Sequence, residues 1–390
     1  MRGRIALAVS AVAVAALGLS GVSAAAPQGH SPTIAKEYFG QADGTAVYRY
    51  TLSNSHGMKV QILSYGGIIQ TLSVPDKHGK SANVVLGFPT LADYVAKNSP
   101  EAGGGVYFGA LIGRYANRIA KGQFTLDGKT YNVPVNNNGN SLHGGLQGFD
   151  KKVWNVTEVP GKGTAGLKLT VTSPDGDQGY PGTLNATVTY TLDEQNRLSI
   201  GYQATTDAPT VVNLTNHTYW NLAGEASGDI YDQKLQLNAA SYTPTDSTQI
   251  PTGQIVPVKG TPFDFTKPTA IGARIADNDP QLVIGQGYDH NWVLNSGGGK
   301  SLTQAAKATD PESGRTLTIS TDQPGIQFYS GNFLDGTLYG TSGHAYRQGY
   351  GFALETQHYP DSPNQPDFPS TVLRPGETYH TTTVFALGTS

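Results

Sequence analysis

Asn213-Leu214-Thr215-Asn216-His217-Thr218-Tyr219-Trp220-Asn221-Leu222 is the stretch from which we infer the fold class. It continues a β-branched pair, Val211-Val212, and its residue types are compatible with an extended strand. Successive side chains of a strand face opposite sides. One predicted face therefore carries Thr215, His217 and Tyr219, and the other carries Leu214, Asn216, Thr218 and Trp220. The pattern predicts a β-strand that presents a histidine among hydroxyl and amide groups.

His217 has two interpretations when it is considered alone. It can be a surface or structural histidine in a polar strand, which is the simpler explanation for any single histidine. Alternatively, its neighbours can orient the imidazole by hydrogen bonds, and its proton can exchange near neutral pH. The rest of the chain decides between the two.

Strand-like segments recur along the chain, and long helical periodicity does not. Asp127-Gly128 lies between two short β-like segments and predicts a two-residue hairpin turn. Residues 90–97 predict one or two helical turns. The further predicted strands are residues 59–65, 68–72, 106–112, 167–171, 186–192, 198–204, 234–237, 292–294, 316–320, 326–329, 352–357 and 381–387. We therefore expect an all-β fold, with two packed antiparallel sheets in one domain spanning residues 35–390.

The composition narrows the functional classes. Charged residues make up 14% of the 390 residues, the formal net charge is -3, and glycine is abundant at 49. A weakly negative chain is not expected to bind nucleic acid or anionic membrane surfaces. The chain contains no cysteine, which excludes disulfides, thiolate metal sites and cysteine nucleophiles.

The N-terminus has the layout of a secretory signal peptide. Arg2 and Arg4 precede an apolar run over residues 5–19, and small residues follow at 23–26. A buried helix or a membrane anchor is the alternative, but the run is short for a bilayer. We assign residues 1–26 to the signal, and expect a secreted or periplasmic protein without a membrane partner after processing.

A second strand places a carboxylate where a ligand could reach it. In residues 352–357 the alternation puts Phe352 and Leu354 on one face and Glu355 on the other. By the same rule Gln327 shares a face with Tyr329. Polar groups beside aromatic rings suit a pyranose, whose hydroxyls need hydrogen bonds and whose C–H face needs flat apolar surface. An exposed strand carboxylate is the simpler alternative for Glu355.

Three further side chains lie in polar loop contexts, and each has a structural alternative. His143 could cap a loop, and Asp289 could begin a turn. Arg118 could pair with a surface carboxylate. A metal site is a weaker alternative, because no two of the nine histidines have the HExxH spacing.

Several ordered segments together resemble the aldose 1-epimerase (galactose mutarotase) family. They are residues 113–119 (GRYANRI), 140–145 (NSLHGG), 175–182 (DGDQGYPG), 213–219 (NLTNHTY), 250–253 (IPTG), 288–290 (YDH), 323–333 (QPGIQFYSGNF), 354–357 (LETQ) and 364–366 (NQP). The resemblance covers the chain from about residue 39 to its end. It implies a large antiparallel β-sandwich of the galactose mutarotase type with the sugar in an open cleft.

The resemblance also implies roles for individual residues. Glu355 matches the family's general base, and His217 matches its general acid. His143 matches a second histidine near the ring oxygen of the sugar. The remaining matches are sugar-binding positions, at Asn117, Arg118, Tyr219, Asp289 and Gln327.

These residue types fit the interconversion of α and β anomers of free hexoses such as glucose and galactose. A carboxylate removes the proton of the anomeric hydroxyl while an imidazolium protonates the ring oxygen. We expect the opposite charges of Glu355 and His217 to stabilise each other's ionised forms. No metal, nucleotide or other cofactor is required by these steps. The sequence does not rank the possible aldoses or give the oligomeric state.

Two rival functions use the same residues differently. A glycosidase needs two carboxylates, for which Glu355 and Asp289 are available, but it leaves His217 without a role. A carbohydrate-binding module would keep the aromatic surface without requiring both Glu355 and His217. An assay of mutarotation separates the three hypotheses.

Overall fold

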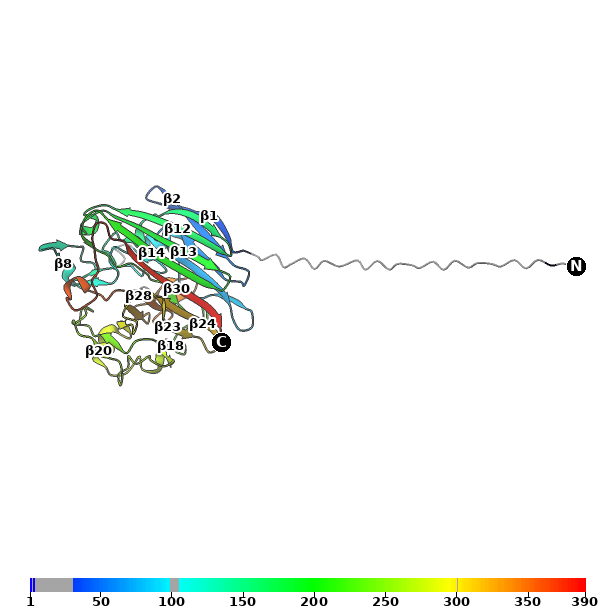
Figure 1. Cartoon of the computed structure of the whole chain (residues 1–390). Helices are drawn as coiled ribbons and strands as arrows, with labels where there is room; N and C mark the ends of the chain where they lie inside the picture. Colours follow the sequence, from blue (N-terminus) through cyan, green and yellow to red (C-terminus); the bar gives the residue numbers. More distant parts are fainter. Residues whose placement is uncertain (2, 4–30, 99–104, 300) are drawn as a thin grey trace. The chain divides into compact units, whose positions relative to one another are not determined.

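Antiparallel sheets dominate the computed structural model, which describes residues 1, 3, 31–98, 105–299 and 301–390. The predicted signal segment 1–26 lies outside this described part, apart from Met1 and Gly3. The largest sheet has nine strands, which run side by side across the molecule in Figure 1. In spatial order they are β11 (Asn155–Gly161), β12 (Thr164–Ser173), β13 (Leu184–Asp193), β14 (Arg197–Thr206), β30 (Tyr379–Thr389), β24 (Arg315–Thr321), β23 (Thr303–Thr309), β18 (Lys234–Leu237) and β21 (Thr269–Ala270).

Two smaller sheets complete the layers. A six-stranded sheet has the order β17 (Tyr219–Trp220), β28 (Phe352–Gln357), β25 (Gly325–Tyr329), β22 (Asp289–Val293), β19 (Ser241–Thr243) and β20 (Val256–Pro257). A five-stranded sheet has the order β1 (Thr33–Ala42), β2 (Thr45–Ser53), β3 (Lys59–Leu63), β4 (Ile69–Pro75) and β5 (Ser81–Asn83). The all-β prediction is confirmed.

Short elements connect the sheets. Two-stranded pairs are β6 (Leu111–Ile112) with β16 (Thr215–Asn216), β7 (Arg118–Ile119) with β10 (Ser141–Leu142), β8 (Gln123–Leu126) with β9 (Lys129–Asn132), β15 (Thr210–Val211) with β29 (Val372–Leu373), and β26 (Asp335–Tyr339) with β27 (Ala345–Arg347). The described α-helices are α1 (Leu91–Lys97) and α2 (Pro280–Gly285), and 3-10 turns cover Ala120–Gly122, Phe149–Lys151, Asp177–Gly179, Ile271–Ala273 and Ser362–Asn364. No helix of the described part is long and apolar enough to cross a membrane.

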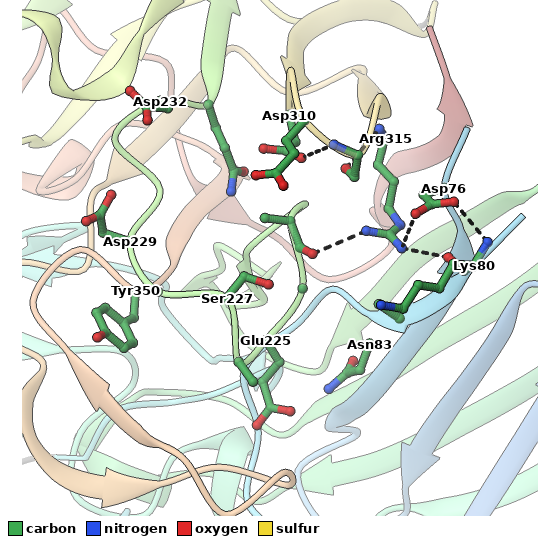
Figure 2. Close-up of a pocket in the computed structure, with 18 of the residues that line it drawn as sticks. Asp76, Lys80, Asn83, Glu225, Ser227, Asp229, Asp232, Asp310, Arg315 and Tyr350 are labelled. Atoms are coloured by element: carbon green, nitrogen blue, oxygen red, sulfur yellow. Dashed lines mark hydrogen bonds and ion pairs between the residues drawn. The ribbon is translucent and has the colours of Figure 1, made fainter. Parts of the chain in front are cut away.

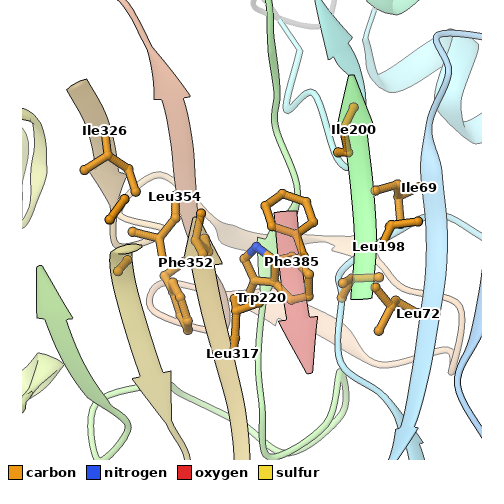
Figure 3. Packing of buried hydrophobic residues seen from close by; sticks show 14 of the residues in the cluster. Ile69, Leu72, Leu198, Ile200, Trp220, Leu317, Ile326, Phe352, Leu354 and Phe385 are labelled. Atoms are coloured by element: carbon orange, nitrogen blue, oxygen red, sulfur yellow. The ribbon is translucent and has the colours of Figure 1, made fainter. Parts of the chain in front are cut away.

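The main core is shared by the nine-stranded, six-stranded and five-stranded sheets. Figure 3 shows Phe352 and Leu354 of β28 in one cluster with Trp220 and with Phe385 of β30, which is a strand of the nine-stranded sheet. Alternation along β13 and β14 buries every second residue, which is the pattern of a sheet covered on its inner face. The face of β28 opposite Phe352 and Leu354 is consequently free to carry a polar site.

The hairpin prediction is confirmed. Asp127 and Gly128 have φ angles of 50° and 77°, and β8 pairs with β9 directly across them. A type I′ turn requires positive φ at both central residues, which Asp-Gly tolerates. The predicted helical turns at residues 90–97 are also confirmed, since α1 spans Leu91–Lys97 with Thr90 as its N-cap.

Two strand predictions are wrong in extent. Residues 106–110 are not extended, because Tyr107 and Gly109 have φ angles of 57° and 68°, and only β6 (Leu111–Ile112) is a strand. The stretch around His217 is also divided. Its short strands β15, β16 and β17 pair with β29, β6 and β28 in turn, so one run of β-like sequence bridges three different sheets.

Truncation of Leu317 in β24 tests the packing between the sheets. Leu317 is fully buried, so Leu317→Ala is expected to lower the free energy of unfolding by about 2–5 kcal/mol through lost apolar contact and an unfilled cavity. Urea denaturation gives this value. Leu302→Ala is the matched control, because Leu302 is 48% exposed and its truncation should change stability by less than about 0.5 kcal/mol. Equal effects of the two variants would contradict the assigned core.

Candidate active site

A cavity of about 340 Å³ opens on the polar face of the six-stranded sheet. Ligand sites for small molecules generally begin near this size. Seven of the eight residues predicted from the sequence line the cavity; they are Asn117, Arg118, His143, His217, Tyr219, Asp289 and Glu355. The eighth, Gln327, lies behind the wall, where its amide contacts Asp289.

Glu355 and His217 are in direct contact at this cavity. Oε1 of Glu355 lies 3.5 Å from Nε2 of His217, and the two side chains are 2% and 6% exposed. The strand alternation explains the carboxylate, because Leu354 on one side of Glu355 enters the core and the next side chain must point away. His217 is fixed through its own backbone, which donates to Ala110 and accepts from Gly109.

Burial controls the protonation of this pair. It raises the pKa of the Glu355 carboxyl well above its ordinary 4.5, and the Asp289 charge adds to this effect while Arg118 opposes it. Burial also lowers the pKa of His217 to about 4. Both pKa shifts favour the uncharged forms of the two side chains, the protonated carboxyl and the neutral imidazole. The expectation that opposite charges would keep both groups ionised is therefore wrong for the free site, because desolvation outweighs their attraction.

Arg118 and Asp289 are joined by an amide that sequence reasoning missed. Gln249 accepts a hydrogen bond from Nη2 of Arg118 at 2.6 Å, and donates one to Oδ2 of Asp289 at 2.7 Å. Gln327 donates to the other Asp289 oxygen at 2.8 Å. The only sequence signal for Gln249 is its position directly before the segment 250–253. The arrangement fixes the cation and the carboxylate at the cavity wall.

His143 is held in one tautomer by the backbone. The Asn117 N–H donates to Nδ1 of His143 at 3.1 Å, so Nδ1 supplies a lone pair. Burial lowers the pKa of His143 well below 6.5, with smaller contributions from His217, Arg118 and Lys151. The imidazole is thus neutral at neutral pH, and its proton is on Nε2. His143 is a hydrogen-bond donor to whatever occupies the cavity.

The same hydrogen bond bears on metal binding. One ligand atom from each of His143, His217 and Glu355 lies within 4.8 Å of the other two. Such a set of two imidazoles and a carboxylate could hold a transition metal. A metal on Nε2 of His143 would, however, move its proton to Nδ1, opposite the Asn117 N–H. The donor geometry therefore opposes a metal at this position.

Aromatic rings pack around the histidines. Tyr219 stacks on His217 with ring centroids 5.0 Å apart, so these two residues share a face as the alternation predicts. Tyr107 lies edge-on to His143 at 4.6 Å and tilted against His217 at 5.8 Å. Tyr107 lies in an apolar run that predicts a strand, so the sequence does not mark it as a site residue. Tyr329, which shares a strand face with Gln327, completes the aromatic lining.

A larger hollow of about 990 Å³ lies elsewhere and contains none of the predicted site residues. Figure 2 shows that Arg315 and several carboxylates, among them Asp76 and Asp310, line this larger hollow. Arg315 is bound to backbone carbonyls, with hydrogen bonds to Leu222 at 3.0 Å and Lys80 at 2.8 Å. These contacts join loops of the fold, so the smaller cavity is the candidate active site despite its size.

A buried carboxylate beside an imidazole, with further donors and acceptors around a sugar-sized cavity, defines an acid–base enzyme for a small polar ligand. The aldose 1-epimerase family model matches residues 48–386. The chain belongs to this family of isomerases.

The relatives cover almost the whole chain. It is 47% identical to a galactose mutarotase of Rattus norvegicus over 355 residues, which are 90% of this chain and 98% of the relative. It is 40% identical to an aldose 1-epimerase of Escherichia coli over 347 residues, covering 88% and 96%. The crystal structure of galactose 1-epimerase from Lactobacillus acidophilus has a TM-score of 0.80 and 28% identity, covering 92% of this chain and all of that one. Mutarotase activity and the galactose mutarotase fold are thereby supported.

The pH dependence of catalysis tests the protonation order at the site. A reaction that uses ionised Glu355 and protonated His217 requires one proton on the pair. Because the pKa of His217 is lowered to about 4 and that of Glu355 is raised, kcat/KM should be bell-shaped with an acid limb near pH 4. The basic limb reports loss of the proton from the pair. Polarimetry after subtraction of the spontaneous rate measures both limbs, and an acid limb near the ordinary histidine value would contradict the assignment.

Proposed function

We propose that this chain interconverts the α and β anomers of free hexoses such as glucose and galactose, with Glu355 as the general base and His217 as the general acid. The observation that carries the proposal is the 3.5 Å contact between these side chains at a cavity of about 340 Å³. The names of the relatives, galactose mutarotase and aldose 1-epimerase, support the same activity.

The proton transfers balance without any other reactant. Glu355 accepts the proton of the C1 hydroxyl, and His217 donates a proton to the ring oxygen as the C1–O bond to that oxygen breaks. The resulting aldehyde rotates about the C1–C2 bond. The reverse transfers then close the ring from either face of the carbonyl, and both side chains return to their initial protonation states. The minor one-proton form of the pair, with Glu355 ionised, is the reactive one.

The remaining residues bind the sugar in this proposal. His143 donates from Nε2 near the ring oxygen, where negative charge would otherwise develop. Arg118 and Asp289 exchange hydrogen bonds with sugar hydroxyls, and Asn117 orients Arg118 by accepting from its backbone N–H at 2.9 Å. Tyr219 supplies ring surface beside His217. Gln327 acts indirectly, because its amide fixes Asp289.

Substitution of the proposed acid and base should separate catalysis from binding. Glu355→Gln cannot accept the proton, and His217→Asn cannot donate as an imidazolium. Each variant is expected to lower the catalysed rate by about 10²–10⁴ with KM largely retained. The double variant should be little worse than the slower single one, since the two groups act as a unit. Polarimetry on freshly dissolved, anomerically pure glucose and galactose measures these rates.

Glu225→Gln is the matched control for the carboxylate. Glu225 is also buried, but it binds Tyr346, Thr341 and Ser342 at the larger hollow and not at the cavity. This variant should keep the wild-type rate even where it lowers stability. Wild-type rates in both Glu355→Gln and His217→Asn would reject the proposed roles.

Export is a separate proposal that rests on the sequence. The order of Arg2 and Arg4, an apolar run and small residues supports cleavage of a signal peptide at about residues 24–26 and a secreted or periplasmic location. N-terminal sequencing of protein collected outside the cytoplasm of the expressing cell should begin between Ala25 and Gln28. Recovery of the whole product inside the cell, still starting at Met1, would reject export.

A further inference from the structure

A row of amide side chains lies beside Glu355 on the same face of the sheet. Asn291, Gln327 and Glu355 are cross-strand neighbours on β22, β25 and β28, and Gln357 follows Glu355 on the same face. Asn291 and Gln357 are almost fully buried, and neither lines the cavity. A bound hexose therefore has no direct access to these two amides.

Polar atoms of this row have no hydrogen-bond partner among the residues that the structure describes. They are Nδ2 and Oδ1 of Asn291, Nε2 and Oε1 of Gln357, Oε1 of Gln327, and Oε2 of Glu355. A buried polar atom generally has a partner, because the loss of its hydration is costly. Such a concentration of amide donors and acceptors on one sheet face points to a shared polar ligand, and not to an isolated defect.

A glycine makes room for one of these amides. Gly325 lies opposite Gln357 in the strand pair. A Cβ at Gly325 would collide with Oδ1 of Asn291 and with the ring of Tyr359, so both of these side chains lie over the glycine. The Asn291 amide therefore leans along the sheet toward the row that carries Gln357. Several donors and acceptors without protein partners on one sheet face are the polar surroundings in which ordered water is found.

We propose that Asn291 and Gln357 are positioning residues that hold ordered water against Oε2 of Glu355 and so solvate the base. This inference rests on the proposed role of Glu355. Oε1 then remains free for the sugar and His217, while Oε2 receives its hydrogen bonds from water and from the amide row. Bridging water of this kind supports a polar group nearly as well as a direct hydrogen bond.

The solvation has a specific consequence for catalysis. The other titratable or charged groups that line the cavity with Glu355 are Tyr107, Arg118, His143, His217, Tyr219, Asp289 and Tyr329. Burial raises the pKa of Glu355 and makes its ionised form the minor one. Water on Oε2 stabilises the carboxylate and increases the fraction of reactive enzyme. Loss of this water should move the basic limb to higher pH and reduce the plateau of kcat/KM by a smaller factor, because a more basic carboxylate also removes the hydroxyl proton faster.

Apolar replacement of the amides tests the proposal. Gln357→Leu and Asn291→Leu keep similar volume and remove the groups that hold the water. Each is expected to move the basic limb up by about one pH unit and to lower the plateau of kcat/KM by up to about tenfold, with KM for galactose unchanged. Gln357→Asn and Asn291→Ser keep a polar group and should restore both quantities. A lower plateau with an unmoved basic limb, or a raised KM, would overturn the proposal.

Gln233→Leu is the matched control, because Gln233 is an equally buried amide at the larger hollow and is bonded to Asn221 and Leu222. It should change stability but neither limb of the pH profile of kcat/KM.

A high-resolution crystal structure of the wild-type protein supplies a test that needs no variant. Water density contacting Oε2 of Glu355 and the Asn291 or Gln357 amide is expected. Direct bonding of Oε2 to protein groups, with no water between them, would overturn the inference.

The effect of the amides on the protonation of Glu355 can be measured separately from the interconversion of anomers. Infrared titration of the carboxyl band, as wild type minus Glu355→Gln, reports the protonation of Glu355 without any turnover. Gln357→Leu should shift this titration to higher pH by about one unit. If the wild-type protein does not interconvert anomers while this shift is observed, the proposed function fails and the water-holding role remains. An unshifted titration in an active enzyme rejects the role of the amide row alone.

Discussion

The desolvation of Glu355 is the constraint on which the site depends. One strand, β28, presents Phe352 and Leu354 to the core between the sheets and Glu355 to the cavity, so the packing that stabilises the fold also removes the carboxylate from water. A change in the packing of β28 would alter the hydration of Glu355 at the same time. Stability and reactivity are therefore coupled through the alternation of a single strand.

Burial gives the acid–base pair an unusual order of proton affinity. With the pKa of His217 lowered and that of Glu355 raised, the proton shared by the pair resides mainly on the carboxyl. The reactive form is a minor population, but the general base in it is correspondingly strong. A buried carboxylate that has a raised pKa removes a hydroxyl proton more readily than an ordinary one, which offsets part of the population loss.

Alternation in the sequence predicts many of the central strands, such as β13, β14 and β28, but the predictions omit β1, β2, β11 and β23. The predicted bounds of β18 and β28 match the observed ones, and in β28 the alternation also shows which side chains face the core. Residues 106–110 were misassigned, since an apolar run does not reveal that Tyr107 has a positive φ. Alternation also predicts that Glu355 lies opposite Phe352 and Leu354 and that Gln327 shares a face with Tyr329. Only the family resemblance, however, predicts that residues from different strands form one site. Hydrogen bonds such as those of Gln249 have no signature in the sequence.

Backbone conformation at the cavity shows what the fold must supply beyond the sheets. Tyr107, Asn117, His143 and Gln249 line the cavity and all have φ between 51° and 66°, a region that residues with a Cβ adopt at a cost of about 1–3 kcal/mol each. Each conformation is held by specific contacts; the Asn117 N–H bonded to His143 connects two of these residues directly. Such turns project side chains inward from loops where an extended strand would alternate them. The packed sheets provide the stability that permits this strain, and the strained loops bring Arg118 and His143 to a carboxylate that the sheet alone presents.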